Sequence, residues 1–273
     1  MIPTFVCGKE KCAPMKNIVS LFVLICAAGF YTIFSQPISN PTSSEKILVK
    51  TDSVVDEQSP IEELYQQIDL ADKLKYEVFE MALLGFDNLP RQNKDIITII
   101  DFSLPSTDKR MYVIDLKNKK LLFHTIVSHG RNSGEKYATS FSNRHGSFQS
   151  SLGFYVTEGT YSGGNGYSLV INGQEKGIND QAKARAVVIH GADYCSTSFI
   201  KTTGRLGRSY GCPALPRELT KPIINTIRNG TGLFIYADNA EYMANSTIVK
   251  DTETLIAAQH TLPDIAPASA ILN

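Results

Sequence analysis

Apolar residues recur at helical spacing between residues 60 and 85. The segment opens with Ser59, Pro60 and Glu62, a capping-box pattern with proline in the first helical turn. Gly85 is a typical helix stop. The apolar positions are Leu64, Ile68, Ala71, Leu74, Val78 and Met81. We therefore expect one or two helices over residues 60–85.

From residue 95 the pattern changes to short β-branched and apolar runs bounded by turn residues. Two of these runs, RMYVIDL and KLLFHTIVS, flank residues 117–120, where Asn118 favours a hairpin turn. Other strands are expected in DIITIIDFS, GFYVTEG, residues 167–171, ARAVVIHGA and GLFIYAD, and a helix in ELTKPIINTIRNG. The pattern predicts a mainly β domain with a few helices over residues 60–240, followed by a polar tail at residues 241–273.

The N-terminal hydropathy pattern indicates export. Three lysines precede the apolar run IVSLFVLICAAGFYTIF, and Met15 offers a second start close to that run. A basic region before an apolar stretch is typical of a signal sequence, and this run is at the short edge of membrane-spanning length. We expect residues 1–36 to be a signal peptide or an N-terminal membrane anchor and residues 37–59 a flexible linker. The domain would then lie in the periplasm or cell envelope.

Charge and cysteine content exclude some classes of protein. Lys plus Arg and Asp plus Glu each number 27, so the formal net charge is zero. This balance lacks the basic excess of a nucleic-acid-binding surface, and no nucleic-acid partner is expected. Only Cys195 and Cys212 of the five cysteines fall within the predicted domain, which is too few for a disulfide framework. A single bridge between these two remains open.

Two short segments carry candidate chemistry. VVIHG delivers His190 at the end of a predicted strand, with Gly191 behind it, and SYGC ends on Cys212. An imidazole beside a thiol can take its proton and leave a nucleophilic thiolate. The carbonyl of Gly191 could orient the ring, and the amides of Gly211 and Cys212 could face a developing oxyanion. Ser209 is as suited to holding the turn by a side-chain hydrogen bond as to assisting the reaction.

These segments resemble the L,D-transpeptidases of the bacterial cell wall, which have a YkuD-like fold. The general family pattern is His-Gly at a strand end, followed after a short interval by Ser/Thr-His-Gly-Cys. The subgroup of murein L,D-transpeptidase catalytic domains is more similar still. The segments that carry this resemblance are SHGRNSG, SFSN, SSLGFYVT, GIND and GRLGRSYGCPALP. The resemblance covers residues 95–236 and implies a β-sandwich or barrel-like catalytic fold.

The chain departs from the general family pattern at two positions. Tyr210 stands where the family has His, and Ala214 stands where the family often has Arg. Arg205 or Arg208 could supply a carboxylate-binding charge in place of that arginine. His129, in the glycine-rich segment, is another candidate for lining the cleft.

The resemblance implies acyl transfer on peptidoglycan stem peptides. Cys212 would attack the third residue of a tetrapeptide, and an amine of a second stem would resolve the thioester into a 3→3 crosslink. Water as acceptor would make the protein an L,D-carboxypeptidase. No metal or organic cofactor is expected. Two other readings are a zinc site on His190, Cys195 and Cys212, and a wall-binding module without activity.

Overall fold

The computed structural model describes residues 59–261, and this part of the chain begins with two helices. Helix α1 spans Pro60–Gln67 and helix α2 spans Tyr76–Asp87. Ser59 caps α1, because its hydroxyl accepts a hydrogen bond from the amide of Glu62 at 3.1 Å. The expectation of one or two helices over this segment is confirmed, with two present. The predicted signal or anchor and nearly all of the predicted linker lie outside the described residues.

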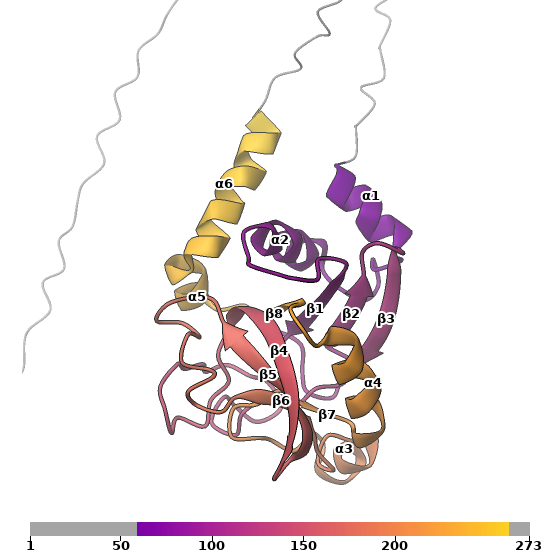
Figure 1. Ribbon diagram of the computed structural model, residues 1–273, viewed down its shortest axis with the longest axis vertical. Coiled ribbons are helices and arrows are strands. Elements are labelled where there is room, and N and C mark those ends of the chain that lie inside the picture. The colour runs from indigo at the N-terminus through magenta and orange to yellow at the C-terminus, as the bar shows by residue number, and fades with distance from the viewer. Residues whose placement is uncertain (1–58, 262–273) are drawn as a thin grey trace, which may run out of the picture. The chain divides into compact units, whose positions relative to one another are not determined.

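Eight strands form one mixed sheet in the order β3-β2-β1-β8-β4-β5-β6-β7 (Figure 1). The hairpin expected around Asn118 is confirmed, because β2 and β3 pair antiparallel on either side of it. The strands are β1 (Ile96–Asp101), β2 (Met111–Asp115), β3 (Lys120–Thr125), β4 (Gly153–Gly163), β5 (Gly166–Gly173), β6 (Val188–Gly191), β7 (Ala214–Leu215) and β8 (Gly232–Tyr236).

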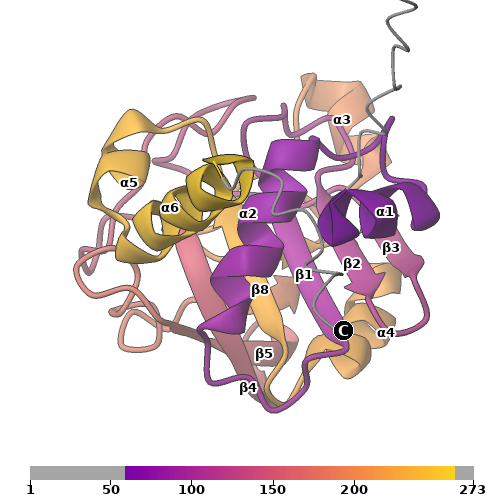
Figure 2. The same ribbon diagram turned by 90° about the horizontal axis from the view of Figure 1, so that it is seen from above.

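The sheet is curled, and helices cover it. Helix α4, Arg217–Ile227, contacts β1 and also the neighbouring strands β5 and β6. Strands β8 and β4 lie between β1 and β5 in the strand order, so the sheet must bend around this helix. Helix α2 packs against β8 (Figure 2). Under α2, the ring of Phe154 on β4 packs edge-on against Phe86 of the helix and stacks on Phe234 of β8, with the latter centroids 4.2 Å apart. The expected mainly β, barrel-like architecture with a few helices is confirmed as a single curled sheet.

One edge of the sheet carries the candidate chemistry. Strands β6 and β7 are parallel, with His190 opposite Ala214. Parallel neighbours need a crossover connection, which here contains helix α3, Thr197–Thr203, and the loop that leads to Cys212. This crossover brings His190 and Cys212 to the same edge. Neither α3 nor the two-residue β7 was expected from the sequence.

The predicted polar tail begins with two helices, α5 (Ala240–Asn245) and α6 (Thr247–Thr261). The hydroxyls of Tyr242 and Ser246 both donate to the buried carboxylate of Glu175, and α6 packs against α2. Residues 240–249 are therefore attached to the domain. Within residues 59–261, the helices are too short or too polar to cross a membrane.

Candidate active site

His190 is buried at the sheet edge, with 4% of its surface exposed. Its Nδ1 lies 3.1 Å from the carbonyl oxygen of Gly191. A carbonyl can only accept, so Nδ1 carries the proton and Nε2 of the neutral ring carries the lone pair. Burial lowers the pKa of His190, the Gly191 carbonyl opposes this, and the charge of Arg217 lowers it further. The ring is therefore an uncharged base at neutral pH.

Gly191 is a glycine because helix α4 approaches its backbone closely. A Cβ at this position would lie 2.3 Å from Oγ1 of Thr220, well inside contact distance. That hydroxyl is itself fixed, because it donates to the carbonyl of Pro216 at 2.9 Å. The close packing on α4 thus holds the carbonyl that orients His190.

Cys212 lies half-buried beside β6, and its sulfur contacts the backbone of that strand. The sulfur accepts from the amide of Val188 at 3.4 Å and approaches the carbonyl oxygen of Ala186 at 3.8 Å. Burial raises the pKa of the thiol, while the Val188 amide and the charge of Arg185 oppose that rise. The resting pair is therefore a neutral thiol and a neutral imidazole, both on one sheet edge.

The turn before Cys212 is held by Ser209. Its hydroxyl donates to the carbonyl of Cys212 at 2.6 Å and accepts from the amide of Gly211 at 3.0 Å. Gly211 has φ +126°, and a Cβ there would lie 2.8 Å from the carbonyl oxygen of Gln149, so only glycine fits. The expectation that the Gly211 amide faces an oxyanion needs correction, because that amide is already paired with Ser209. Ser209 has the turn-holding position.

Arg185 is part of the site and gave no signal in the sequence. Its guanidinium donates to the carbonyl oxygens of Ser142 and Gln149, each at 2.6 Å, and to the hydroxyls of Ser147 and Ser151. Burial lowers the pKa of Arg185, and its interaction with Cys212 opposes that shift. Arg185 therefore fixes the loop over residues 142–151 and places a positive charge near the sulfur.

A protein-family profile described as L,D-transpeptidase catalytic domain matches residues 70–236, more than half of the chain. The chain belongs to this family. His190, Cys212 and the turn between Ser209 and Cys212 all fall within the matched segment. The matched residues also include the whole sheet, from β1 to the end of β8.

Solved structures with a similar fold come from several bacteria. An L,D-transpeptidase from Mycobacterium smegmatis has 12% identity and a TM-score of 0.33, with 52% of this chain and 59% of that chain covered. L,D-transpeptidase 3 from Mycobacterium tuberculosis has 13% identity and a TM-score of 0.34, with 52% of this chain and 61% of that chain covered. A fused Zn-dependent amidase/peptidase/peptidoglycan-binding domain-containing protein from Clostridium acetobutylicum has 17% identity and a TM-score of 0.35. The match covers 65% of this chain and 63% of that chain.

The chain thus spans about three fifths of the length of these structures. Among curated proteins, no match to the chain is found. The family assignment rests on the profile match.

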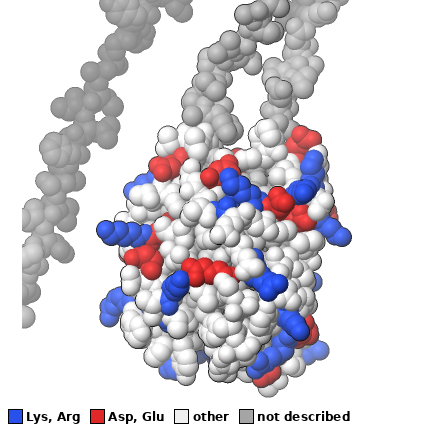
Figure 3. Space-filling view, in the orientation of Figure 1, with Lys and Arg blue, Asp and Glu red and all other residues white. Residues whose placement is uncertain are grey.

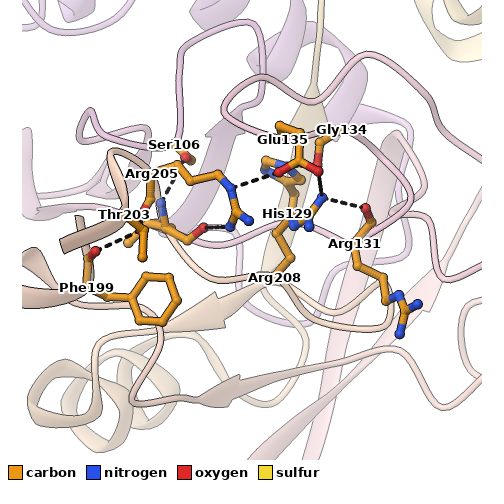
Figure 4. A network of polar contacts seen from close by, with 10 residues as sticks. Ser106, His129, Arg131, Gly134, Glu135, Phe199, Thr203, Arg205 and Arg208 are labelled. Carbon is orange, nitrogen blue, oxygen red and sulfur yellow. Dashed lines mark hydrogen bonds and ion pairs between the residues drawn. The ribbon is translucent and has the colours of Figure 1, made fainter. Parts of the chain in front are cut away.

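In this L,D-transpeptidase domain, Arg205 and Arg208 are engaged with protein groups. Both form ion pairs with Glu135, at 2.8 and 2.7 Å (Figure 4). Arg208 also donates to the carbonyls of Arg131 and Gly134, and Arg205 to the carbonyl of Leu206. These contacts tie the loop at residues 131–135 to the segment before Cys212, and the role of the two arginines in binding a substrate carboxylate stays a prediction.

His129 is buried, with 0% of its surface exposed, so the expectation that it lines the cleft is wrong. Its Nδ1 accepts from the guanidinium of Arg110 at 2.8 Å, and its Nε2 lies 3.3 Å from the carbonyl oxygen of Gly134. Burial, followed by the charge of Arg110, lowers the pKa of His129 to about 3. The ring is a neutral link between the buried Arg110 and the loop.

Tyr210 is exposed two residues before Cys212, with 67% of its surface in solvent. Its ring lies against that of Phe148, with centroids 4.9 Å apart. The guanidinium of Arg131 lies 5.5 Å from the Phe148 centroid and 5.6 Å from the Tyr210 centroid. We call these three residues the aromatic shelf.

Cys195 is a packing residue. It is fully buried in a small cluster with Ile126 and Leu206, and burial raises the pKa of its thiol to about 12. Both it and Cys212 are free thiols, so the bridge left open above is not formed. Within residues 59–261, no three or more His, Cys, Asp or Glu side chains are grouped to hold a metal ion.

Charged side chains do not gather by sign on the face drawn in Figure 3. Lys and Arg alternate there with Asp and Glu across the surface. Long-range steering by one large charged patch therefore has no support on this face.

Proposed function

We propose that the domain catalyses acyl transfer on peptidoglycan stem peptides, with Cys212 as nucleophile and His190 as general base. The observation that carries the proposal is the contact of Nδ1 of His190 with the carbonyl of Gly191, which leaves Nε2 as the basic nitrogen. Membership in the L,D-transpeptidase family supports the same chemistry. The contact and the family assignment are independent.

In the first half-reaction, Nε2 of His190 takes the proton of the Cys212 thiol while the sulfur attacks the carbonyl of the L-centred third residue. The tetrahedral adduct collapses to a thioester, and the peptide C–N bond breaks. The proton on His190 passes to the departing amine, so the terminal D-amino acid leaves neutral at nitrogen.

In the second half-reaction, an amine of another stem attacks the thioester, and His190 takes one of its protons. The C–S bond breaks, a 3→3 crosslink forms, and the proton returns to the sulfur. Water in place of the amine gives a shortened stem and the same regenerated thiol. The proton count closes in both cases without a cofactor.

The sulfur must turn away from Val188 and Ala186 to reach a substrate. This rotation gives up one weak hydrogen bond, for which about 1 kcal/mol or less is reasonable. The charge of Arg185 favours the thiolate as it forms. The amide of Cys212 itself is the donor that we assign to the oxyanion, because the Gly211 amide is paired with Ser209.

We also place the enzyme outside the cytoplasmic membrane. Peptidoglycan lies there, and the predicted signal or anchor at residues 1–36 would export the domain. The two inferences agree, although one concerns the substrate and the other concerns the N-terminal hydropathy pattern.

Incubation with a disaccharide tetrapeptide, followed by mass analysis, tests the proposal. Wild type should give a 3→3 dimer or a tripeptide, according to whether an amine or water resolves the thioester. Cys212→Ala should give neither while keeping its fold by circular dichroism. An unchanged substrate with folded wild-type protein, or full activity in Cys212→Ala, would contradict the assignment.

A further inference from the structure

We propose that Arg131, supported on the rings of Phe148 and Tyr210, binds the C-terminal carboxylate of the donor stem peptide. The inference rests on the proposed function, because it names the group that selects a substrate for Cys212. It assigns to Arg131 a specificity-determining role that the sequence left to Arg205 or Arg208.

The backbone of Arg131 is fixed next to the nucleophile. Its amide donates to the carbonyl of Ser209 at 2.7 Å, and its own carbonyl accepts from Arg208 at 3.0 Å. Gly130, the preceding residue, forms a parallel bridge with Ser209. The backbone of Arg131 is therefore paired with that of Ser209, three residues before Cys212.

The side chain of Arg131 leads away from the ion pairs that occupy its neighbours (Figure 4). Its guanidinium lies over two aromatic rings, an arrangement that supports a cation without using its N–H groups. Arg131 is exposed, as are both rings. The planar fork can therefore turn its donors to a ligand in solvent.

Phe148 supplies a second, independent observation. Its φ is +54°, which is rare for a bulky aromatic residue and costs backbone energy. Phe148 in this conformation is 39% exposed, next to Tyr210. The surrounding backbone holds it there, because the Phe148 carbonyl accepts from the amide of Asn132 at 3.1 Å. A strained, exposed aromatic residue beside a nucleophile is expected of a binding surface rather than of packing.

Other arginines near Cys212 are already committed. Arg205 and Arg208 are paired with Glu135, and Arg185 donates to four oxygens of its own loop. The guanidinium of Arg131, by contrast, lies over the two rings of the aromatic shelf, and its N–H groups face solvent.

The ligand chemistry follows from these groups. A guanidinium fork matches a carboxylate in geometry and charge. In the proposed reaction the terminal carboxylate lies one residue beyond the carbonyl that Cys212 attacks. Tyr210 lies two residues before Cys212, a span of at most about 7 Å along an extended backbone. The apolar faces of the shelf would cover the side chain of the terminal D-residue.

The test compares two donor peptides that differ only at the C-terminus, one a carboxylate and the other a carboxamide. Wild type should prefer the carboxylate by roughly tenfold to a hundredfold in kcat/KM, as expected for one charge-assisted contact. Arg131→Gln should lose that preference, chiefly through a raised KM for the carboxylate peptide and with a smaller change for the carboxamide peptide. Arg131→Lys should keep part of it, because the charge remains without the fork.

Arg228→Gln, an exposed arginine at the end of α4, is the matched control and should keep the full preference. The same peptides are also compared by Kd on the Cys212→Ala background, which tests the contact without turnover. Loss of the Kd preference in Arg131→Gln supports the inference. If wild type turns over neither peptide, the proposed reaction is rejected, but this binding result still supports the role of Arg131. An unchanged preference, or equal losses for both peptides, would overturn the inference.

Discussion

The sulfur of Cys212 accepts a hydrogen bond from the amide of Val188, two residues before His190 on the same strand. Cys212 therefore lies beside the strand that carries His190. Burial raises the pKa of Cys212 and lowers that of His190, so each group favours its uncharged form. In the proposed reaction, the thiolate is therefore made during the attack on the substrate instead of being stored as an ion pair.

Alkylation of Cys212 by iodoacetamide should accordingly be slower at pH 7 than that of a free cysteine. Since the thiolate reacts and burial raises the pKa of Cys212, the rate should climb with pH through a midpoint above that of a free cysteine. Peptide mapping by mass spectrometry follows Cys212 separately from the other cysteines. Rapid labelling at pH 7 with a midpoint well below 8 would instead indicate a stored thiolate–imidazolium pair.

Replacing Arg185 with Gln should loosen the loop over residues 142–151 and move the Cys212 alkylation midpoint to higher pH. The guanidinium makes four hydrogen bonds to that loop, and its charge lowers the thiol pKa. Hydrogen exchange measures the first effect and the alkylation profile the second. Arg228→Gln should change neither, and equal behaviour of the two variants would refute the role given to Arg185.

Substituting Ala for Gly191 should destabilise the domain by about 1–3 kcal/mol, because the new Cβ would lie 2.3 Å from Oγ1 of Thr220. Gly159→Ala, on strand β4, is the control, since nothing lies within 4 Å of a Cβ there. Urea unfolding measures both. The double variant with Thr220→Ala should recover part of the loss, and a fully additive result would show that this contact is not the cause.

His129 should resist protonation in the folded protein. Its pKa is lowered to about 3 by burial and by Arg110, whereas the unfolded chain binds the proton near 6.5. The unfolded state therefore holds more protons between these values, and folding stability falls as pH drops from 6.5 toward 3, by up to about 5 kcal/mol from this group. An NMR titration of the ring checks this directly, and an imidazole that titrates near 6.5 would disprove it.

Local pattern was enough to predict the central elements. The α1 cap at Ser59 and the hairpin around Asn118 both depend on neighbouring residues, and both are present. Strand β7 has only two residues, and its place is set by pairing with β6 across a long crossover, so no local pattern marks it. The helices after residue 239 likewise depend on Glu175, far away in the chain.

In the candidate site, too, features set by neighbouring residues could be predicted, and features set by distant residues could not. His190 and Cys212 were found because their segments have a characteristic order of residues. Arg185 was missed because its role depends on oxygens more than 30 residues earlier in the chain. Arg205 and Arg208 were both open candidates for a substrate carboxylate, because the sequence cannot show that Glu135 pairs with them.

Intact-protein mass spectrometry during turnover tests the central claim most directly. Mixed with a tetrapeptide donor and no acceptor amine, wild type should gain the mass of the peptide less its terminal D-amino acid. That adduct should map to Cys212 and be released by hydroxylamine, as expected of a thioester, and it should be absent from Cys212→Ala. An adduct on another residue, or crosslinking by Cys212→Ala, would contradict the account.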